Sequence, residues 1–223
     1  MDGRRRVRQG GSGRVAAMTA GSIKGESSEG FPLAGRAGIF EELLGILRTV
    51  RKGKVGAVVI NGPSGSGKTA VLELFLEHCR NAARGVRVLS AMGDEWEAQF
   101  PLAGYSQLML TSPLRSAKDY DGGPALPAGP VPALTAAQVV NYASTLSTHL
   151  EALQAHGSVV VAIDDVHKLD VESLRILTFV MRRLYGKRVL FVLTLNPDDA
   201  LRVPSGVLDF LTGHRSPVFR LIR

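Results

Sequence analysis

A glycine-rich segment carries the residue types that bind phosphate. Its sequence, Gly62-Pro63-Ser64-Gly65-Ser66-Gly67-Lys68-Thr69, fits the pattern G-x-x-x-x-G-K-[ST]. Glycines let the backbone curl so that successive N–H groups point inward at the start of a helix. Lys68 then brings a positive charge to the β- and γ-phosphates, and the Thr69 hydroxyl becomes a Mg²⁺ ligand. We therefore expect residues 62–70, Ala70 included, to bind nucleotide; the alternative is a glycine-rich turn that caps a helix.

Two adjacent carboxylates follow an apolar run further along the chain. Residues 159–163 are Val-Val-Val-Ala-Ile, and Asp164 and Asp165 come directly after them. Open α/β sheets bind ligands at the carboxyl ends of their strands, so this pair is typical of a Walker B strand. Asp164 is predicted to hold Mg²⁺, directly or through water, and Asp165 to orient or polarise an attacking water. The alternative is that the two acids only cap the next turn. Lys68 and Asp165 are the predicted catalytic residues.

Other polar residues lie close to these acids in the sequence. Thr194 or Asn196, at the end of another apolar run, could reach the γ-phosphate as a sensor, because neighbouring parallel strands end at the same edge. A lone His167 is more often structural than catalytic. Asp170 is expected to cap the helix that follows it.

The elements that must position these residues follow from hydrophobic periodicity. Short apolar runs predict strands over residues 57–60, 86–91, 158–163, 188–195 and 217–222. Helical spacing predicts helices over residues 39–50, 68–84, 100–110, 135–156 and 170–185, with a helical turn at 206–211. Continuous apolar strands that alternate with helices favour a parallel sheet covered on both faces. The predicted fold is α/β, a P-loop NTPase with a five-stranded, mostly parallel sheet in a three-layer sandwich.

The chain divides into a tail and a domain. Residues 1–30 are rich in Arg, Gly and Ser and carry a net charge of +3 out of the total +7, which is typical of a disordered basic tail. Translation from Met18 is an alternative start. Residues 31–223 form the expected ATPase domain, in which residues 111–134, rich in Pro, Gly and Ser, are expected to be a mobile segment.

Composition excludes several other classes of protein. The 223 residues are 45% hydrophobic and 21% charged, enough for a globular core. A single cysteine, Cys79, cannot form an intramolecular disulfide, and no Cys/His cluster has zinc-ligand spacing. The apolar runs are much shorter than the roughly 20 residues that cross a bilayer. We therefore expect a cytoplasmic protein without membrane contact.

Four segments together resemble a known family. They are Leu33-Ala34-Gly35-Arg36, the P-loop, Phe100-Pro101-Leu102-Ala103 before Gln107-Leu108, and residues 163–170, Ile-Asp-Asp-Val-His-Lys-Leu-Asp. This pattern resembles the nucleotide-binding module of large ATP-binding regulators of the LuxR type, within the STAND NTPases. The resemblance implies that ATP or ADP acts as a conformational switch and that a distant helix-turn-helix domain binds promoter DNA. It also places Arg36 near the base or ribose.

The sequence departs from that family at three points. An aromatic residue usually stands where this chain has Lys168, and an Arg often stands where it has Asn196. Such regulators also continue into a helical lid, a sensor array and a DNA-binding domain, for which this chain has no room. We therefore expect the lid to be absent, and the chain to be either a fragment or a lone module.

These observations favour an ATP-binding regulatory switch with Mg²⁺ and, at most, slow ATP hydrolysis. It would control transcription through domains missing from this chain, contact protein partners or itself, and meet DNA only indirectly. Two alternatives stay open: a DNA-binding regulator that uses its basic tail, and a P-loop kinase of small molecules.

Overall fold

The computed structural model describes residues 37–53, 56–81, 83, 85–113, 133–184, 187–205, 207 and 218–220. These residues belong to one compact unit, Pro32–Arg223. Three of the sequence expectations fall outside the described residues: the basic tail at 1–30, the nucleotide contact of Arg36, and all but the ends of the segment at 111–134.

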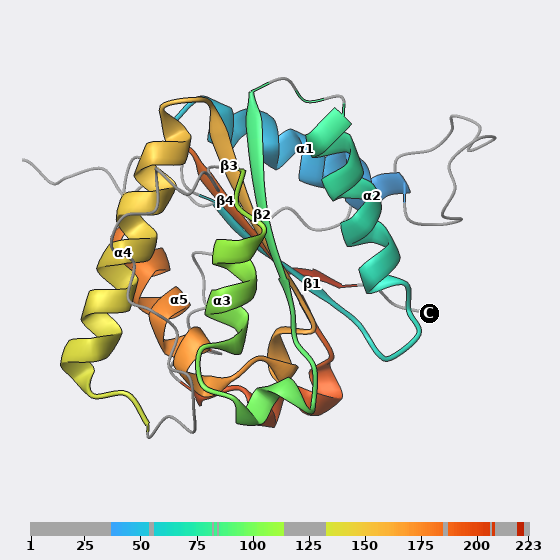
Figure 1. Cartoon of the computed structure of the whole chain (residues 1–223). Coiled ribbons are helices and arrows are strands. Elements are labelled where there is room, and N and C mark those ends of the chain that lie inside the picture. Colours follow the sequence, from blue (N-terminus) through green and yellow to red (C-terminus); the bar gives the residue numbers. More distant parts are fainter. Residues whose placement is uncertain are drawn as a thin grey trace, which may run out of the picture. The chain divides into compact units, whose positions relative to one another are not determined.

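A twisted parallel sheet forms the centre of the domain (Figure 1). Its four long strands are β1 (Gly56–Asn61), β2 (Val86–Met92), β3 (Ser158–Asp164) and β4 (Val189–Leu195), and the three residues of β5 (Val218–Arg220) pair with β1. The strand order is β2-β3-β4-β1-β5, and every pair is parallel. The expected parallel sheet is confirmed, although the run predicted at 217–222 is a described strand only over Val218–Arg220.

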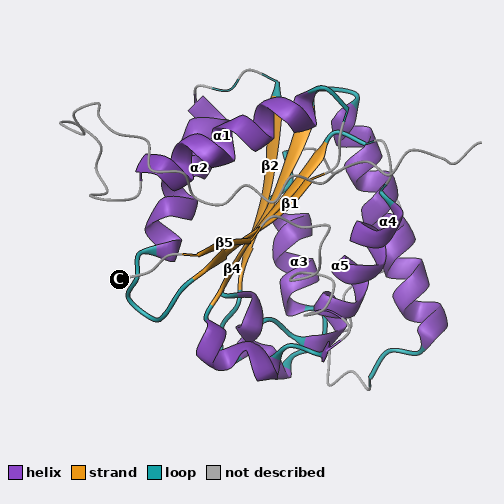
Figure 2. Ribbon diagram, turned by 180° about the vertical axis from the view of Figure 1, so that it is seen from behind, coloured by secondary structure: helices purple, strands orange, loops and turns teal. Residues whose placement is uncertain are grey.

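Helices cover both faces of this sheet (Figure 2). Two helices, α1 (Ala37–Arg51) and α2 (Lys68–Asn81), pack on one face. Three helices, α3 (Ala103–Leu110), α4 (Ala136–Gln154) and α5 (Val171–Arg183), pack on the other. The predicted α/β fold, a parallel sheet covered by helices on both faces, is therefore confirmed.

The strands contain continuous apolar runs because each face of the sheet packs against its own hydrophobic core. Val159, Val161 and Ile163 contribute to the core under α3, α4 and α5, whereas Val160 and Ala162 contribute to the core under α1 and α2. Successive strand residues point to opposite faces, so a strand buried on both faces must be apolar at every position. All seven residues of β3 are buried.

Several helix boundaries differ from those predicted. The helix expected from residue 100 begins at Ala103, because Leu102 adopts a left-handed conformation with φ 72° that cannot continue a helix. The helix expected to residue 84 ends at Asn81. The starts of α4 and α5 are as expected: Thr135 forms a capping box with Gln138, and the Asp170 side chain accepts a hydrogen bond from the Ser173 N–H.

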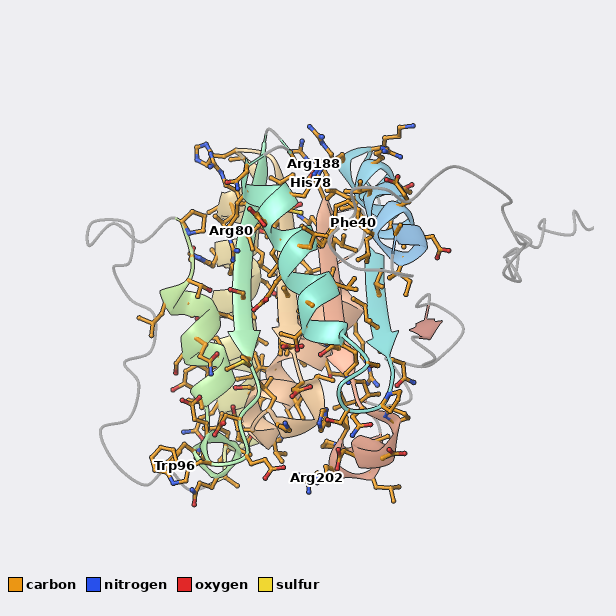
Figure 3. All side chains as sticks on the ribbon, turned by 90° about the vertical axis from the view of Figure 1, so that its right-hand side faces the viewer. Phe40, His78, Arg80, Trp96, Arg188 and Arg202 are labelled. Carbon is orange, nitrogen blue, oxygen red and sulfur yellow. The ribbon has the colours of Figure 1, made fainter. Side chains whose placement is uncertain are left out.

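Three short 3₁₀ helices lie at the carboxyl ends of strands and were not predicted. They are η1 (Glu97–Gln99), η2 (Val166–Lys168) and η3 (Pro197–Arg202). Figure 3 shows Trp96, before η1, and Arg202, in η3, at the same end of the molecule, opposite to His78 and Arg80. No helix among these described residues is long and apolar enough to span a membrane.

Candidate functional site: a P-loop beside an acidic strand end

The loop between β1 and α2 is curled in the manner that the glycine spacing predicts. Gly65 and Gly67 have φ values of 70° and 86°, a region that residues with a Cβ rarely adopt. The Ser66 N–H donates to the Pro63 carbonyl oxygen at 3.2 Å. The Val71 N–H donates to the Gly67 carbonyl oxygen at 3.1 Å, which is a hydrogen bond of the first turn of α2. The loop therefore closes on the amino end of a helix, where backbone N–H groups favour an anion.

Lys68 is held beneath this loop. Its side chain is buried, with 6% of the residue exposed, and the Nζ donates to the carbonyl oxygens of Gly62 at 2.9 Å and Pro63 at 3.0 Å. An ammonium group has three donors, of which the two carbonyls accept two. The positive charge thus stays fixed at the loop, where phosphate oxygens would need it.

The first acid of the Walker B strand meets the P-loop directly. The Thr69 hydroxyl, at the start of α2, donates to Asp164 Oδ2 at 2.7 Å, although the two residues are 95 positions apart in the sequence. The other carboxylate oxygen, Oδ1, accepts a hydrogen bond of 2.5 Å from the Thr194 hydroxyl at the end of β4. The two residues predicted to bind Mg²⁺ are therefore adjacent.

The second acid, Asp165, has its own set of contacts. Its backbone is left-handed, with φ 47° and ψ 54°, a conformation that Asp tolerates better than most residues. Its N–H donates to Thr194 Oγ1 at 2.8 Å, and its Oδ2 accepts a hydrogen bond of 2.9 Å from Lys168 Nζ. The hydrogen bond to Asp165 raises the pKa of Lys168 above its ordinary 10.5, partly opposed by burial. Asp165 is thus paired with a firmly charged ammonium group.

His167 lies between acids but stays neutral near pH 7. Burial lowers its pKa below the ordinary 6.5, and this effect outweighs the charges of Asp165 and Asp199, which raise it. The distance from its Nε2 to Asp199 Oδ2 is 3.7 Å, and its Nδ1 is buried without a hydrogen-bond partner among the described residues. The charge of Lys68 also lowers this pKa, so the imidazole lies within electrostatic range of the P-loop, and the structural role of His167 stays a prediction.

Asn196 has a local role in this structure. Its side-chain oxygen accepts from the Asp198 N–H at 3.3 Å, and its Nδ2 donates to Asp199 Oδ2 at 2.6 Å, so the residue caps η3. Of the two sensor candidates, Thr194 is the one whose hydroxyl hydrogen-bonds to Asp164 and Asp165.

Asp170 connects two of the segments that carried the family resemblance. One carboxylate oxygen accepts from the N–H groups of Leu102 at 2.8 Å and Ser173 at 2.9 Å, and the other accepts from the Gly104 N–H at 2.9 Å. Capping of α5 was predicted, but the bonds to the start of α3 were not. Because Leu102 is left-handed, its own N–H and that of Gly104 both point to the buried carboxylate of Asp170. Sequence spacing does not reveal this geometry.

The donor set at the strand end fits a magnesium ion bound together with a nucleotide. Mg²⁺ takes a hydroxyl and one or two carboxylates and fills its other positions with water and phosphate oxygens. Thr69 and Asp164 provide such a pair. Among the described residues there is no cluster of three or more His, Cys, Asp and Glu side chains that could hold a metal without such help.

A strand, a curled glycine loop and a helix joined in this order place the chain in the class of P-loop NTPases. Within that class the chain belongs to the AAA ATPase domain family, which it matches over residues 32–192. No curated protein matches the sequence.

Solved structures share this fold at low sequence identity. They include Cdc6p from Pyrobaculum aerophilum, with 16% identity and a TM-score of 0.56 over 85% of this chain and 45% of that one. The Drosophila ORC bound to DNA has 14% identity and a TM-score of 0.54 over 84% and 43%. The Aeropyrum pernix ORC1 protein in complex with DNA has 17% identity and a TM-score of 0.52 over 84% and 45%. The chain thus spans less than half the length of these three neighbours.

Proposed function

We propose that this domain is an ATP-binding regulatory switch that hydrolyses ATP slowly and works in the cytoplasm. The contact between Thr69 and Asp164 carries the proposal, because it joins the phosphate loop to the acidic strand end. In this reading the curled loop and Lys68 hold the phosphates, and Thr69 and Asp164 hold the magnesium ion. When bound, that ion would offset the charge of the β- and γ-phosphates. Asp165 would orient the attacking water.

The regulatory part of the proposal rests on the resemblance to LuxR-type regulators of the STAND group. On this view the bound nucleotide, ATP or ADP, sets the conformation of the domain, and domains outside this chain carry the effect to promoter DNA. Arg36 would contact the base or ribose, and Asn196 would report on the γ-phosphate after leaving its cap on η3. Protein partners or a second copy of the chain would receive the signal.

Calorimetric titration tests the binding step. Mg-ATP and Mg-ADP are titrated into the full chain and into the Lys68→Ala variant. We expect saturable binding to the full chain and no measurable heat from the variant, because the substitution removes the ammonium group at the loop. The matched control is Lys187→Ala, since Lys187 pairs with Glu151 at 3.0 Å, away from the loop. Binding that survives Lys68→Ala would contradict the assignment of the loop.

The regulatory step needs a different measurement. A mobility-shift series with promoter DNA compares the full chain with a chain that starts at Met18. Because we propose that DNA is met only through other domains, we expect neither chain to bind with sequence preference. Affinity that disappears with residues 1–17 would instead favour a DNA-binding tail, whose contacts with phosphates weaken steeply with salt.

A further inference from the structure

The second acid at the strand end is engaged in an ion pair. Asp165 directly follows β3, and its backbone N–H is fixed by Thr194, so its position relative to Asp164 is set. One of its carboxylate oxygens, however, accepts the hydrogen bond from Lys168 at 2.9 Å. A carboxylate that orients water must offer an oxygen and its negative charge to that water.

The local backbone brings these two side chains together. Asp165 is the residue before η2, and Lys168 is the last residue of that single 3₁₀ turn. Side chains three residues apart lie one above the other in a 3₁₀ helix, so the left-handed Asp165 faces the ammonium group. The side chains of Asp165 and Lys168 are 26% and 29% exposed. The pair is thus partly open to solvent and can separate without burying an isolated charge.

Other acids surround the same lysine. The charges of Glu95 and Asp199, as well as that of Asp165, raise the pKa of Lys168, so both carboxylates are near its ammonium group. Arg202 joins these two acids, with 3.1 Å to Glu95 and 3.5 Å to Asp199. The Lys168 ammonium group therefore lies within electrostatic range of two further carboxylates, one on η3 and one on the segment before η1.

We propose that Lys168 is a positioning residue that restrains Asp165 and keeps ATP hydrolysis slow. The inference rests on the proposed function and deepens it. In the hydrolysis, the water oxygen forms a bond to the γ-phosphorus as the bond from that phosphorus to the β–γ bridging oxygen breaks. The products are ADP and phosphate, and Asp165 accepts the proton that the water loses. With Lys168 in place, the carboxylate is turned to the ammonium group and its charge is offset there.

Rate measurements on two lysine variants test the restraint. Lys168→Met removes the charge and keeps the stem, whereas Lys168→Arg keeps the charge. We expect the single-turnover rate of ATP hydrolysis to rise about 1.5-fold to fivefold in Lys168→Met, the range that corresponds to the loss of a partly exposed ion pair. The dissociation constant for Mg-ATP should not change, and Lys168→Arg should restore the slow rate. Lys187→Met, at the opposite ends of the strands, is the control for loss of a surface lysine.

A double-mutant cycle shows whether Lys168 acts through Asp165. In the Asp165→Asn background, Lys168→Met should have no effect on the hydrolysis rate. The urea midpoints of the two single variants and the double variant provide a readout without ATP. If the ion pair exists in solution, the losses of stability should not add up, because residues in direct contact are coupled.

The outcomes separate the restraint from the proposed function. Absence of Mg-ATP binding to the unmodified chain would overturn both. Normal binding with an unchanged rate in Lys168→Met would overturn the restraint alone. A slower rate in Lys168→Met would overturn it as well and would indicate that the lysine stabilises the transition state. Stability losses that are fully additive would show that the two side chains do not interact.

Discussion

The hydroxyl of Thr194 joins the two acids at the strand end. It donates to Asp164 Oδ1 at 2.5 Å and accepts from the backbone N–H of Asp165 at 2.8 Å. The parallel register pairs Ile163 on β3 with Leu193 on β4, so Thr194 comes level with the acids one residue further on. Thr194 is fully buried, and both of its hydrogen bonds are therefore shielded from water.

Replacing Thr194 with Val should weaken both the fold and the metal site. The two side chains have similar volumes, but valine leaves Asp164 Oδ1 and the Asp165 N–H without this partner. We expect the free energy of unfolding to fall by about 1–3 kcal/mol and the affinity for Mg-ATP to decrease. Urea denaturation and calorimetry provide the two measurements. Thr194→Ser keeps the hydroxyl and should lose much less; equal losses in the two variants would contradict this role.

Replacing Asp170 with Ala should be among the more damaging single changes. Asp170 is 2% exposed, and its carboxylate accepts hydrogen bonds from the N–H groups of Leu102, Gly104 and Ser173. Its removal leaves three N–H groups unpaired, and we expect a loss of about 3–5 kcal/mol in the free energy of unfolding. Asp170→Asn keeps one acceptor oxygen, so its free energy of unfolding should lie between those of Asp170→Ala and the unmodified chain. A midpoint of urea unfolding equal to that of the unmodified chain would show that water replaces the carboxylate.

Gly93 lies against the backbone of the acidic turn. A Cβ at this position would be 2.3 Å from the Asp165 carbonyl oxygen and 2.9 Å from the Leu169 nitrogen. Gly93→Ala must therefore displace the turn, and we expect a loss of about 1–3 kcal/mol in stability together with weaker Mg-ATP binding.

The matched control for this change is Gly45→Ala. Gly45 lies in α1, and a Cβ there would have no atom within 4 Å of it. Alanine favours helices over glycine by about 0.5–1 kcal/mol, so the control should stabilise the chain. Thermal denaturation of both variants gives the comparison, and a stable Gly93→Ala variant with normal nucleotide binding would disprove the close approach.

The half-buried His149 should make stability depend on pH. Burial lowers its pKa below the ordinary 6.5 in the folded state, while its Nε2 lies 2.6 Å from Ser112 Oγ. The unfolded chain therefore binds more protons between these two pKa values. The contribution of His149 is complete above pH 6.5 and is lost as the pH falls through the window below it. Urea midpoints at pH 7.5 and 5.5 should differ less in His149→Gln than in the unmodified chain; an equal difference would assign the effect elsewhere, for example to His167.

The single cysteine should be inert while the protein is folded. Burial raises the pKa of the Cys79 thiol to about 12, although the charge of Arg80 opposes the rise. Only the thiolate reacts with iodoacetamide, so alkylation at pH 8 should be far slower in buffer than in concentrated urea. Mass spectrometry measures both rates, and fast alkylation in buffer would show that α2 opens readily.

The sequence allows prediction of the parts of the site that depend on local pattern. The P-loop follows from the residue types at fixed spacing, and two of its glycines, Gly65 and Gly67, take the left-handed conformations that the curl requires. The apolar run before Asp164 identifies a strand buried on both faces, and parallel strands bring their carboxyl ends to one edge. These two rules suffice to place Thr69 beside Asp164.

The remaining features depend on contacts between distant segments. Neither the hydrogen bond from Leu102 to Asp170 nor the hydrogen bond from Thr194 to Asp164 follows from spacing. The first depends on how α3 meets α5, and the second depends on strand register. The ion pair of Lys168 with Asp165 needs the left-handed turn at Asp165, and no composition rule predicts a positive φ for a residue other than glycine.

The chain contains its own optical reporter. Its single tryptophan, Trp96, is 68% exposed and stacks edge-on against Phe100, with 4.7 Å between ring centroids. The neighbouring Glu95 is bound to Arg202 of η3, whose Asp199 influences Lys168. If these charged side chains rearrange on ligand binding, the surroundings of the Trp96 indole should change, and its fluorescence emission should change with them. Intrinsic fluorescence can therefore follow the domain in real time without a dye or an engineered label.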